Sequence, residues 1–218
     1  MLLGRSAIIQ QLVERNWRLY IDGQEQDLSF GRDLPQYLSI GPHSMDLTLG
    51  PNLLVPSVRC PPLLDDRPLL DGRGCIGVDP LRENRQSYER VQLPTLLAPR
   101  ACALAAVRER LECRNPIEIG GRLRYFTTKV DGRSTVGRLF LMVHVTAGYG
   151  DYGFSGCYTL ELVNLSHFPI KLHPGMRVAQ MSFEEVYQPD LYDGGYGPSG
   201  APQLDGQPQP PITGPGRF

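Results

Sequence analysis

Short segments of alternating hydrophobic and polar residues dominate the chain from His43 onward, and they predict β-strands. Successive side chains of a strand point to opposite faces, so alternation indicates a strand with one buried face. Gly, Pro and Asn separate these segments, as in an all-β barrel or jelly roll built from short strands. The predicted strands are residues 44–50, 52–57, 122–130, 139–146, 157–164 and 176–186.

One helix is predicted near the N-terminus, over residues 7–16, with Ser6 as the residue that caps it. Four apolar residues form a stripe at helical spacing: Ile8, Ile9, Leu12 and Val13. A second segment, residues 101–113 (ACALAAVRERLEC), contains Ala, Leu, Arg and Glu in proportions typical of a helix. Propensity is a weak guide, however, because tertiary contacts override it.

Glu161 is an unexpected residue within the predicted strand 157–164. It shares a face with Cys157, Thr159 and Val163, and its two neighbours in the chain are leucines. A carboxylate in an otherwise uncharged strand is expected to be at least partly buried. Because burying an ionised carboxylate without a partner costs free energy, such a residue is usually paired, protonated or used in proton transfer.

Length and composition restrict the classes of protein. A chain of 218 residues suits one domain, or one domain with appendages, and does not require two domains. The 22 Lys and Arg residues balance 23 Asp and Glu residues, so no overall field attracts a nucleic acid polymer or an anionic membrane. Five cysteines without a CxxC pair argue against a disulfide framework and a structural zinc site, and favour a reducing cytoplasm. The N-terminal residues resemble neither a signal peptide nor a membrane span.

Two segments are expected to lie outside the regular structure. Residues 57–82, rich in Pro, Asp, Arg and Gly, are predicted to form an irregular insertion in a β domain spanning 1–187. Residues 188–218 contain seven glycines and seven prolines, which predicts a flexible arm. The arm either has no role, as many termini do, or closes over a ligand with the polar groups of Tyr196, Gln203 and Gln207.

Two neighbouring motifs offer polar groups to a ligand. GRSTVGR, residues 132–138, carries arginines and hydroxyls that suit phosphate oxygens, although a solvated turn explains the same pattern and no Walker sequence is present. HVTAGYGDYGFSG, residues 144–156, contains four glycines and the carboxylate of Asp151. That carboxylate either caps its own turn or accepts a hydrogen bond from a sugar hydroxyl.

The sequence contains no zinc-deaminase signature. Neither HxE nor PCxxC occurs, and the four histidines, His43, His144, His167 and His173, lack the spacing of metal ligands. His144 lies in an apolar segment, where a histidine is more often a core residue than a ligand. If the protein deaminates a nucleobase, the reaction is expected to proceed without zinc.

Four segments in order resemble the dCTP deaminase family, a branch of the dUTPase-like superfamily. They are IGPHSMDLTLGPNLLV (40–55), GRSTVGRLFLMVHVTAG (132–148), DYGFSGCYTLELVN (151–164) and PGMRVAQMSFE (174–184). The resemblance implies a mainly β, dUTPase-like distorted jelly roll or β-barrel with a short N-terminal helix and a flexible C-terminal arm. It also implies β structure for residues 101–113, against their helical propensity.

The resemblance assigns Glu161 a catalytic role. The glutamate would take a proton from water and deliver it to N3 of cytosine, while hydroxide attacks C4 and ammonia leaves. Ser134 and the backbone carbonyl of Ala147 would hold the attacking water, and Arg138 would orient the glutamate. A partly apolar pocket is expected to raise the pKa of Glu161 toward neutrality. The alternative is a structural ion pair between Glu161 and Arg138.

The resemblance also implies contacts to a deoxycytidine nucleotide. The phosphates would meet three residues of the GRST motif, and the base edge would meet the strand backbone. Asp151 would meet the 3'-hydroxyl of deoxyribose, and the Phe154 ring would pack under the sugar and disfavour a 2'-hydroxyl. Mg²⁺ would accompany the triphosphate. The residues implied are Arg133, Ser134, Thr135, Arg138, Asp151, Phe154, Thr159, Leu160, Gln180, Tyr196, Gln203 and Gln207.

Several positions depart from the family pattern. Gln203 replaces a common Lys and Leu204 a common aromatic residue, so the arm offers less charge to a terminal phosphate. Gly150 and Tyr152 replace more usual residues of the glycine loop. A monophosphate or a modified cytosine nucleotide is therefore a conceivable substrate.

The sequence thus predicts a cytoplasmic, homotrimeric hydrolase that converts dCTP to dUTP and ammonia at sites shared between subunits. A first alternative is a bifunctional enzyme that also releases dUMP and pyrophosphate, or a dUTPase. A second is a nucleotide-binding regulator that retains the fold without turnover.

Overall fold

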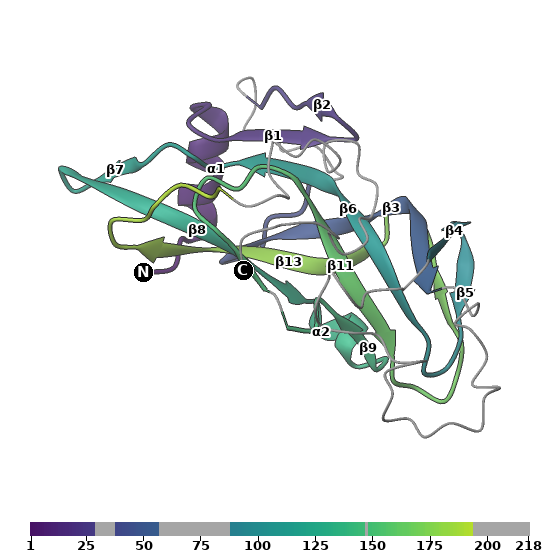
Figure 1. Cartoon of the computed structure of the whole chain (residues 1–218). Helices are drawn as coiled ribbons and strands as arrows, with labels where there is room; N and C mark the ends of the chain where they lie inside the picture. The colour runs from purple at the N-terminus through teal and green to yellow at the C-terminus, as the bar shows by residue number, and fades with distance from the viewer. Residues whose placement is uncertain (29–37, 57–87, 147, 194–218) are drawn as a thin grey trace.

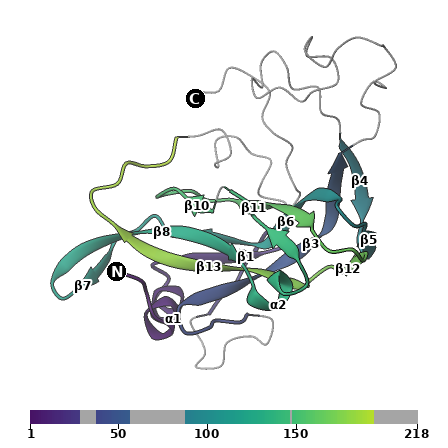
Figure 2. The ribbon, with the colours of Figure 1, turned by 90° about the horizontal axis from the view of Figure 1, so that it is seen from below.

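The computed structural model describes residues 1–28, 38–56, 88–146 and 148–193. Within these ranges the chain is mainly β, which confirms the predicted fold class, and Figures 1 and 2 show a strongly curled sheet. Eleven of the described strands belong to this sheet: β1 (Arg18–Ile21), β2 (Gln24–Glu25), β3 (Ser44–Pro56), β4 (Tyr88–Gln92), β6 (Cys102–Glu112), β7 (Ile117–Ile119), β8 (Arg122–Gly132), β9 (Leu141–Val143), β10 (Tyr149–Gly150), β11 (Cys157–Asn164) and β13 (Arg177–Val186).

The sheet is antiparallel and its strand order differs from the order in the chain. Its central path runs β10-β8-β13-β3-β6-β1-β2. Four strands branch from it, with β4 on β3, β7 on β8, β11 on β6 and β9 on β11. Two further strands, β5 (Thr95–Leu97) and β12 (Ile170–Leu172), form a separate pair.

Within residues 101–113, Cys102–Glu112 form strand β6, as the family resemblance predicts and the helical propensity does not. The strand pairs with β1, β3 and β11, so its backbone groups are hydrogen-bonded from several neighbours. Buried Ala103, Ala105, Val107 and Leu111 fall on alternate positions and face the core. Tertiary pairing and burial therefore override the local preference.

Helix α1 (Arg5–Val13) begins and ends earlier than predicted. Its N-cap is Gly4, and the Arg5 backbone N–H donates to the Pro42 carbonyl at 2.8 Å, so Ser6 lies inside the first turn and caps nothing. The helix cannot reach residue 16 because Arg15 adopts a positive φ of 58°. The apolar stripe is confirmed where Ile8 and Leu12 are buried.

The largest buried side chains gather where α1 meets the sheet. The Trp17 ring lies 4.8 Å from the Phe183 ring and 6.4 Å from the Phe126 ring, measured between centroids. All three side chains are almost completely buried. Burial of one such side chain stabilises the fold by roughly 1.5–3 kcal/mol, so this cluster holds the segment between α1 and β1 against β8 and β13.

Two predicted strand boundaries are wrong. Residues 44–56 form one strand, β3, because a register shift between Leu49 and Leu53 absorbs the Gly-Pro-Asn segment without ending the strand. Residues 139–146 contain only the short strand β9. A one-turn helix, α2 (Ser134–Gly137), precedes it, and positive φ angles at Phe140 and His144 interrupt the extended backbone on both sides.

The predicted insertion at 57–82 and the arm beyond residue 193 lie outside the described residues. The division into a β domain over 1–187 and an arm over 188–218 therefore stays a prediction. Of the described helices, the longer has nine residues, too few to cross a membrane.

Candidate active site

Glu161 lies at the centre of β11, on the less buried face of the strand. The predicted alternation is confirmed, because Tyr158, Leu160, Leu162 and Asn164 are buried while Glu161 is half-buried with 41% of its side chain exposed. On one side of the strand, Glu161 pairs with Leu104 of β6. On the other side, its carbonyl accepts a hydrogen bond from the His144 backbone at 2.9 Å.

His144 is the partner of the Glu161 carboxylate within the chain. Its Nδ1 lies 3.0 Å from Oε2 of Glu161, and the His144 side chain is only 6% exposed. An ionised carboxylate only accepts hydrogen bonds, so Nδ1 carries the donated proton. The other ring nitrogen, Nε2, is buried and has no hydrogen-bond partner in the described part of the chain. The sequence identified His144 as a core residue and missed this contact.

The pKa of Glu161 is lowered, contrary to the prediction. Burial alone raises it, but the hydrogen bond and charge of His144, together with backbone N–H donors of Glu161 and Val145, outweigh burial. The prediction was wrong because it considered the apolar neighbours along the strand and not the histidine that the β9 turn brings alongside. Glu161 is therefore ionised at neutral pH.

A glycine loop follows β10 and carries Asp151 and Phe154. Asp151 is exposed, and its carbonyl accepts a hydrogen bond from the Phe154 backbone at 2.9 Å, which closes the turn. The Phe154 ring lies 5.0 Å from the Tyr158 ring. Tyr158 in turn lies 6.1 Å from the His144 ring, edge to face. The loop is thus packed against the same side-chain group that holds Glu161.

Gly150 is required for this packing. A Cβ at this position would overlap the Tyr158 hydroxyl and the Thr128 hydroxyl, which hydrogen-bond to each other in that space. Burial raises the pKa of Tyr158, so the phenol stays protonated. The departure from the family pattern at residue 150 is therefore explained by the large side chain at residue 158.

Two more predicted residues, Arg133 after β8 and Gln180 on β13, lie near Asp46 of β3. Arg133 follows β8, and its Nε lies 3.2 Å from Oδ1 of Asp46 on β3. Arg177 on β13 approaches the other oxygen of Asp46 at 3.6 Å. Gln180 pairs with Asp46 on one side and with Asp131 on the other. Two guanidinium groups around one carboxylate leave a local positive charge, which suits phosphate oxygens.

The residues of α2 do not contact Glu161 within the chain. Ser134, Thr135 and Arg138 are exposed, and no hydrogen bond or ion pair joins any of them to Glu161 among the described residues. The alternative of an ion pair between Glu161 and Arg138 is thus not observed in the single chain. Ala147, Tyr196, Gln203 and Gln207 lie outside the described residues.

Thr159 and Leu160 precede Glu161 on β11. Their backbones pair with Ala106 and Ala105 of β6, and the Leu160 side chain is fully buried. A contact of Leu160 to a base therefore involves its backbone and not its side chain.

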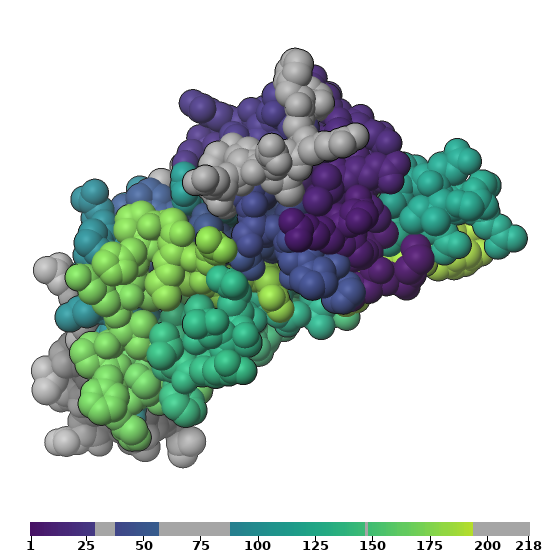
Figure 3. Space-filling view, turned by 180° about the vertical axis from the view of Figure 1, so that it is seen from behind, coloured from purple at the N-terminus to yellow at the C-terminus, as the bar shows by residue number. Residues whose placement is uncertain are grey.

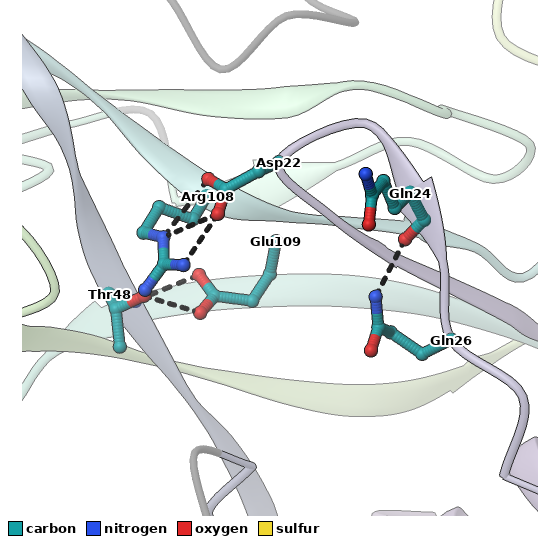
Figure 4. A network of polar contacts seen from close by, with 6 residues as sticks. All are labelled: Asp22, Gln24, Gln26, Thr48, Arg108 and Glu109. Carbon is teal, nitrogen blue, oxygen red and sulfur yellow. Dashed lines mark hydrogen bonds and ion pairs between the residues drawn. The ribbon is translucent and has the colours of Figure 1, made fainter.

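Glu109 is a second carboxylate that the sequence analysis missed, and it is 96% buried (4% exposed). Its two oxygens accept hydrogen bonds from the Thr48 backbone at 2.8 Å and the Thr48 hydroxyl at 2.6 Å (Figure 4). Burial raises its pKa, and the bonds from Thr48 only partly oppose this. Because β3 changes register beside Thr48, its N–H needs an acceptor outside the ladder, so Glu109 has a structural role.

A cavity of about 170 Å³ adjoins Glu109. Glu109 lies five positions after Leu104, the partner of Glu161, on the same strand. The lining contains none of the residues predicted for the nucleotide: it consists of Ile21, Thr48, Arg108, Glu109, Gly175 and Arg177. Arg108 is itself paired with Asp22 (Figure 4).

The described residues contain no group of three or more His, Cys, Asp or Glu side chains arranged to ligate a metal ion.

Sequence comparison extends the resemblance to named relatives. Residues 24–186 match the sequence model of the family described as dCTP deaminase-like. A protein of Coprothermobacter proteolyticus named "dCTP deaminase, dUMP-forming" is 33% identical over 153 residues, which cover 68% of this chain and 70% of the relative. A protein of the same name from Dictyoglomus turgidum is 36% identical over 155 residues, covering 69% and 68%.

A solved structure shares the fold. The crystal structure of 2'-deoxycytidine 5'-triphosphate deaminase from Agrobacterium tumefaciens aligns with a TM-score of 0.54 and 20% identity, covering 85% of this chain and 48% of that one. With the family match over residues 24–186, the curled sheet and the ordered motifs, the chain belongs to the dCTP deaminase-like family.

Proposed function

We propose that this protein deaminates dCTP and hydrolyses the triphosphate, so that dCTP and two water molecules yield dUMP, ammonia and pyrophosphate. The observation that carries the proposal is the ionised, half-buried carboxylate of Glu161 on β11, hydrogen-bonded to His144 in a dCTP deaminase-like fold. The names of the relatives support this dUMP-forming reaction over release of dUTP, which the sequence motifs alone favoured.

In the proposed deamination, the Glu161 carboxylate accepts a proton from water and passes it to N3 of cytosine. The hydroxide bonds to C4, and the N3–C4 double bond becomes single. The hydroxyl proton then moves through Glu161 to the amino group, the C–N bond breaks, and ammonia leaves as the C4 carbonyl forms. His144 keeps the carboxylate oriented for both transfers. A positioned acid-base of this kind contributes about 10²- to 10⁴-fold to the rate.

The glycine-loop residues and the residues around Asp46 are proposed to contact different parts of the nucleotide. Asp151 and Phe154 lie in the loop beside Tyr158, which supports their contact to deoxyribose. Arg133 lies beside Arg177 at Asp46, and this pair of guanidinium groups supports the contact of Arg133 to phosphates. Mg²⁺ would enter bound to the phosphate oxygens and would neutralise their charge.

We further propose a homotrimer in which a second copy supplies Ser134 and Arg138 to Glu161. These two residues are exposed and do not bond to Glu161 in their own chain. A patch of exposed apolar residues lies near them, on the segment from α2 to β9 and on the turn after β11. Figure 3 shows these two segments side by side on the face behind that of Figure 1. The patch consists of Leu139, Phe140, Met142, Val145, Leu165 and Phe168, with Phe140 64% and Phe168 76% exposed. Contiguous exposed apolar residues are typical of a protein interface.

The reaction is tested by incubating the protein with dCTP, and separately with dUTP, in the presence of Mg²⁺. We expect ammonia, dUMP and pyrophosphate to appear together without accumulation of dUTP. Accumulating dUTP identifies a deaminase without triphosphate cleavage. Pyrophosphate from dUTP without ammonia from dCTP identifies a dUTPase, and nucleotide binding without turnover identifies a regulator.

Shared sites are tested by mixing two inactive variants, Glu161→Gln and Arg138→Ala, after reversible dissociation. If each site combines residues of two chains, random reassembly restores about a quarter of the sites. If each chain builds its own site, mixing restores no activity.

A further inference from the structure

The residues that follow β13 fold back onto the glycine loop. The Tyr192 backbone N–H donates to the Tyr152 carbonyl at 2.8 Å. A Cβ at Gly153 would lie 2.7 Å from Cδ2 of Leu191, so Leu191 packs directly on the Gly153 backbone, whose φ is +83°. Residues 191–192 therefore contact the loop that carries Asp151 and Phe154.

The contact continues as a row of rings toward Glu161. The Tyr192 and Phe154 rings meet edge to face, with centroids 5.5 Å apart and planes at 85°. Phe154 contacts Tyr158 at 5.0 Å, and Tyr158 contacts His144 at 6.1 Å. His144 ends the row with its 3.0 Å bond to Glu161. Tyr192 is thus the outermost member of a continuous row that reaches the carboxylate.

The inner part of this row has little freedom to move. Tyr158 is 7% exposed, and its hydroxyl is bonded to Thr128 in the space that Gly150 leaves open. Close-packed interiors offer few alternative positions to such a ring. The outer part of the row is less confined, because Phe154 is only partly buried. The Tyr192 ring packs on the Phe154 ring. The position of Phe154 therefore depends on Tyr192.

We propose that Tyr192, in the segment after β13, is a positioning residue for the sugar-binding turn. Through this turn it helps the protein to prefer deoxyribose over ribose. The Tyr192 ring and backbone hold the Asp151–Phe154 turn against Tyr158, so the distance between the sugar-binding carboxylate and the Phe154 ring is fixed. The inference rests on the proposed function, in which Asp151 and Phe154 contact the sugar. A looser turn leaves room for a 2'-hydroxyl and holds the 3'-hydroxyl less well.

The test compares kcat and KM for dCTP and CTP in the full-length protein and three variants. The free energy that an aromatic pair contributes corresponds to a change of about 2- to 13-fold in an equilibrium constant. We expect Tyr192→Ala to lower the dCTP-to-CTP ratio of kcat/KM by roughly that factor, mainly through KM for dCTP. Tyr192→Phe keeps the ring and should retain the ratio. Tyr187→Ala is the matched control, because Tyr187 lies in the same segment and is 88% exposed.

A second readout does not require turnover. Amide hydrogen exchange of residues 150–156 should be faster in Tyr192→Ala than in the unsubstituted protein, Tyr192→Phe and Tyr187→Ala. Unchanged exchange in this peptide overturns the proposal, as does an equal loss of kcat on both nucleotides with an unchanged ratio. If no form of the protein releases ammonia, the proposed function fails, while the exchange comparison still decides whether Tyr192 holds the turn.

Discussion

Replacing His144 with alanine tests the environment that the structure gives Glu161. The substitution removes the 3.0 Å bond from Nδ1 to Oε2. A hydrogen bond to a charged group contributes about 1.5–3 kcal/mol when it is buried. Since 41% of the Glu161 side chain is exposed, solvent screening reduces this to roughly 1–1.5 kcal/mol. We therefore expect kcat on dCTP to fall about 5- to 12-fold with little change in KM.

The pH dependence of His144→Ala gives a sharper readout than the rate at one pH. His144 lowers the pKa of Glu161 against the opposing effect of burial, so its removal raises that pKa. The acid limb of the kcat/KM profile should then move to higher pH, because the carboxylate must be ionised to accept a proton. A carboxyl group whose pKa is lowered by folding stabilises the folded state at pH values above its ordinary pKa. This stabilisation is lost as the pH falls through the pKa that the group has in the folded protein.

Two controls complete the His144 experiment. His167→Ala removes an exposed histidine and should leave both the rate and the acid limb unchanged. Urea unfolding should show a stability gap between His144→Ala and the unsubstituted protein at neutral pH that narrows in acid. If the acid limb of His144→Ala coincides with that of the unsubstituted protein, the reasoning about this pair is refuted.

Two further substitutions probe the packing. Glu109→Ala should lower the free energy of unfolding by about 1–3 kcal/mol, because the Thr48 N–H loses its acceptor. Because the pKa of Glu109 is raised in the folded protein, the free energy of unfolding should fall as pH rises above the ordinary pKa of a glutamate. Glu109→Gln keeps an acceptor for Thr48 and should remove this pH dependence. Urea unfolding at several pH values measures the free energy of unfolding of both variants. Gly150→Ala should cost about 1–3 kcal/mol by overpacking against Tyr158, and the second substitution Tyr158→Leu should restore part of it in the same assay. Additive losses in that double variant would contradict the clash.

The sequence alone predicts the two faces of the strand that carries Glu161 better than it predicts the side chains around that carboxylate. Alternation on residues 157–164 identifies the faces of β11 correctly, because strand periodicity is a local property. The position of His144 beside Glu161 depends on a turn with positive φ after β9, which no local pattern indicates. The direction of the Glu161 pKa was wrong for the same reason.

Two other features depend on contacts between segments far apart in the chain. Glu109 accepts from Thr48, 61 residues earlier, at a register shift that appears only when β3 pairs with β6. Strand β6 contradicts the helical propensity of its own residues, and the family resemblance was needed to predict it. The cytoplasmic location, the magnesium ion and the roles of Tyr196, Gln203 and Gln207 stay predictions.

The central claim is that Glu161 transfers the protons of dCTP deamination, and Glu161→Gln tests it most directly. Glutamine keeps the size of the side chain and a hydrogen-bonding oxygen but cannot carry the proton. Ammonia release should fall by about 10²- to 10⁴-fold, while calorimetry should show dCTP binding close to that of the unsubstituted protein. Glu118→Gln, at an exposed position of β7, is the control and should retain full activity. Ammonia release by Glu161→Gln at the rate of that control would contradict the account.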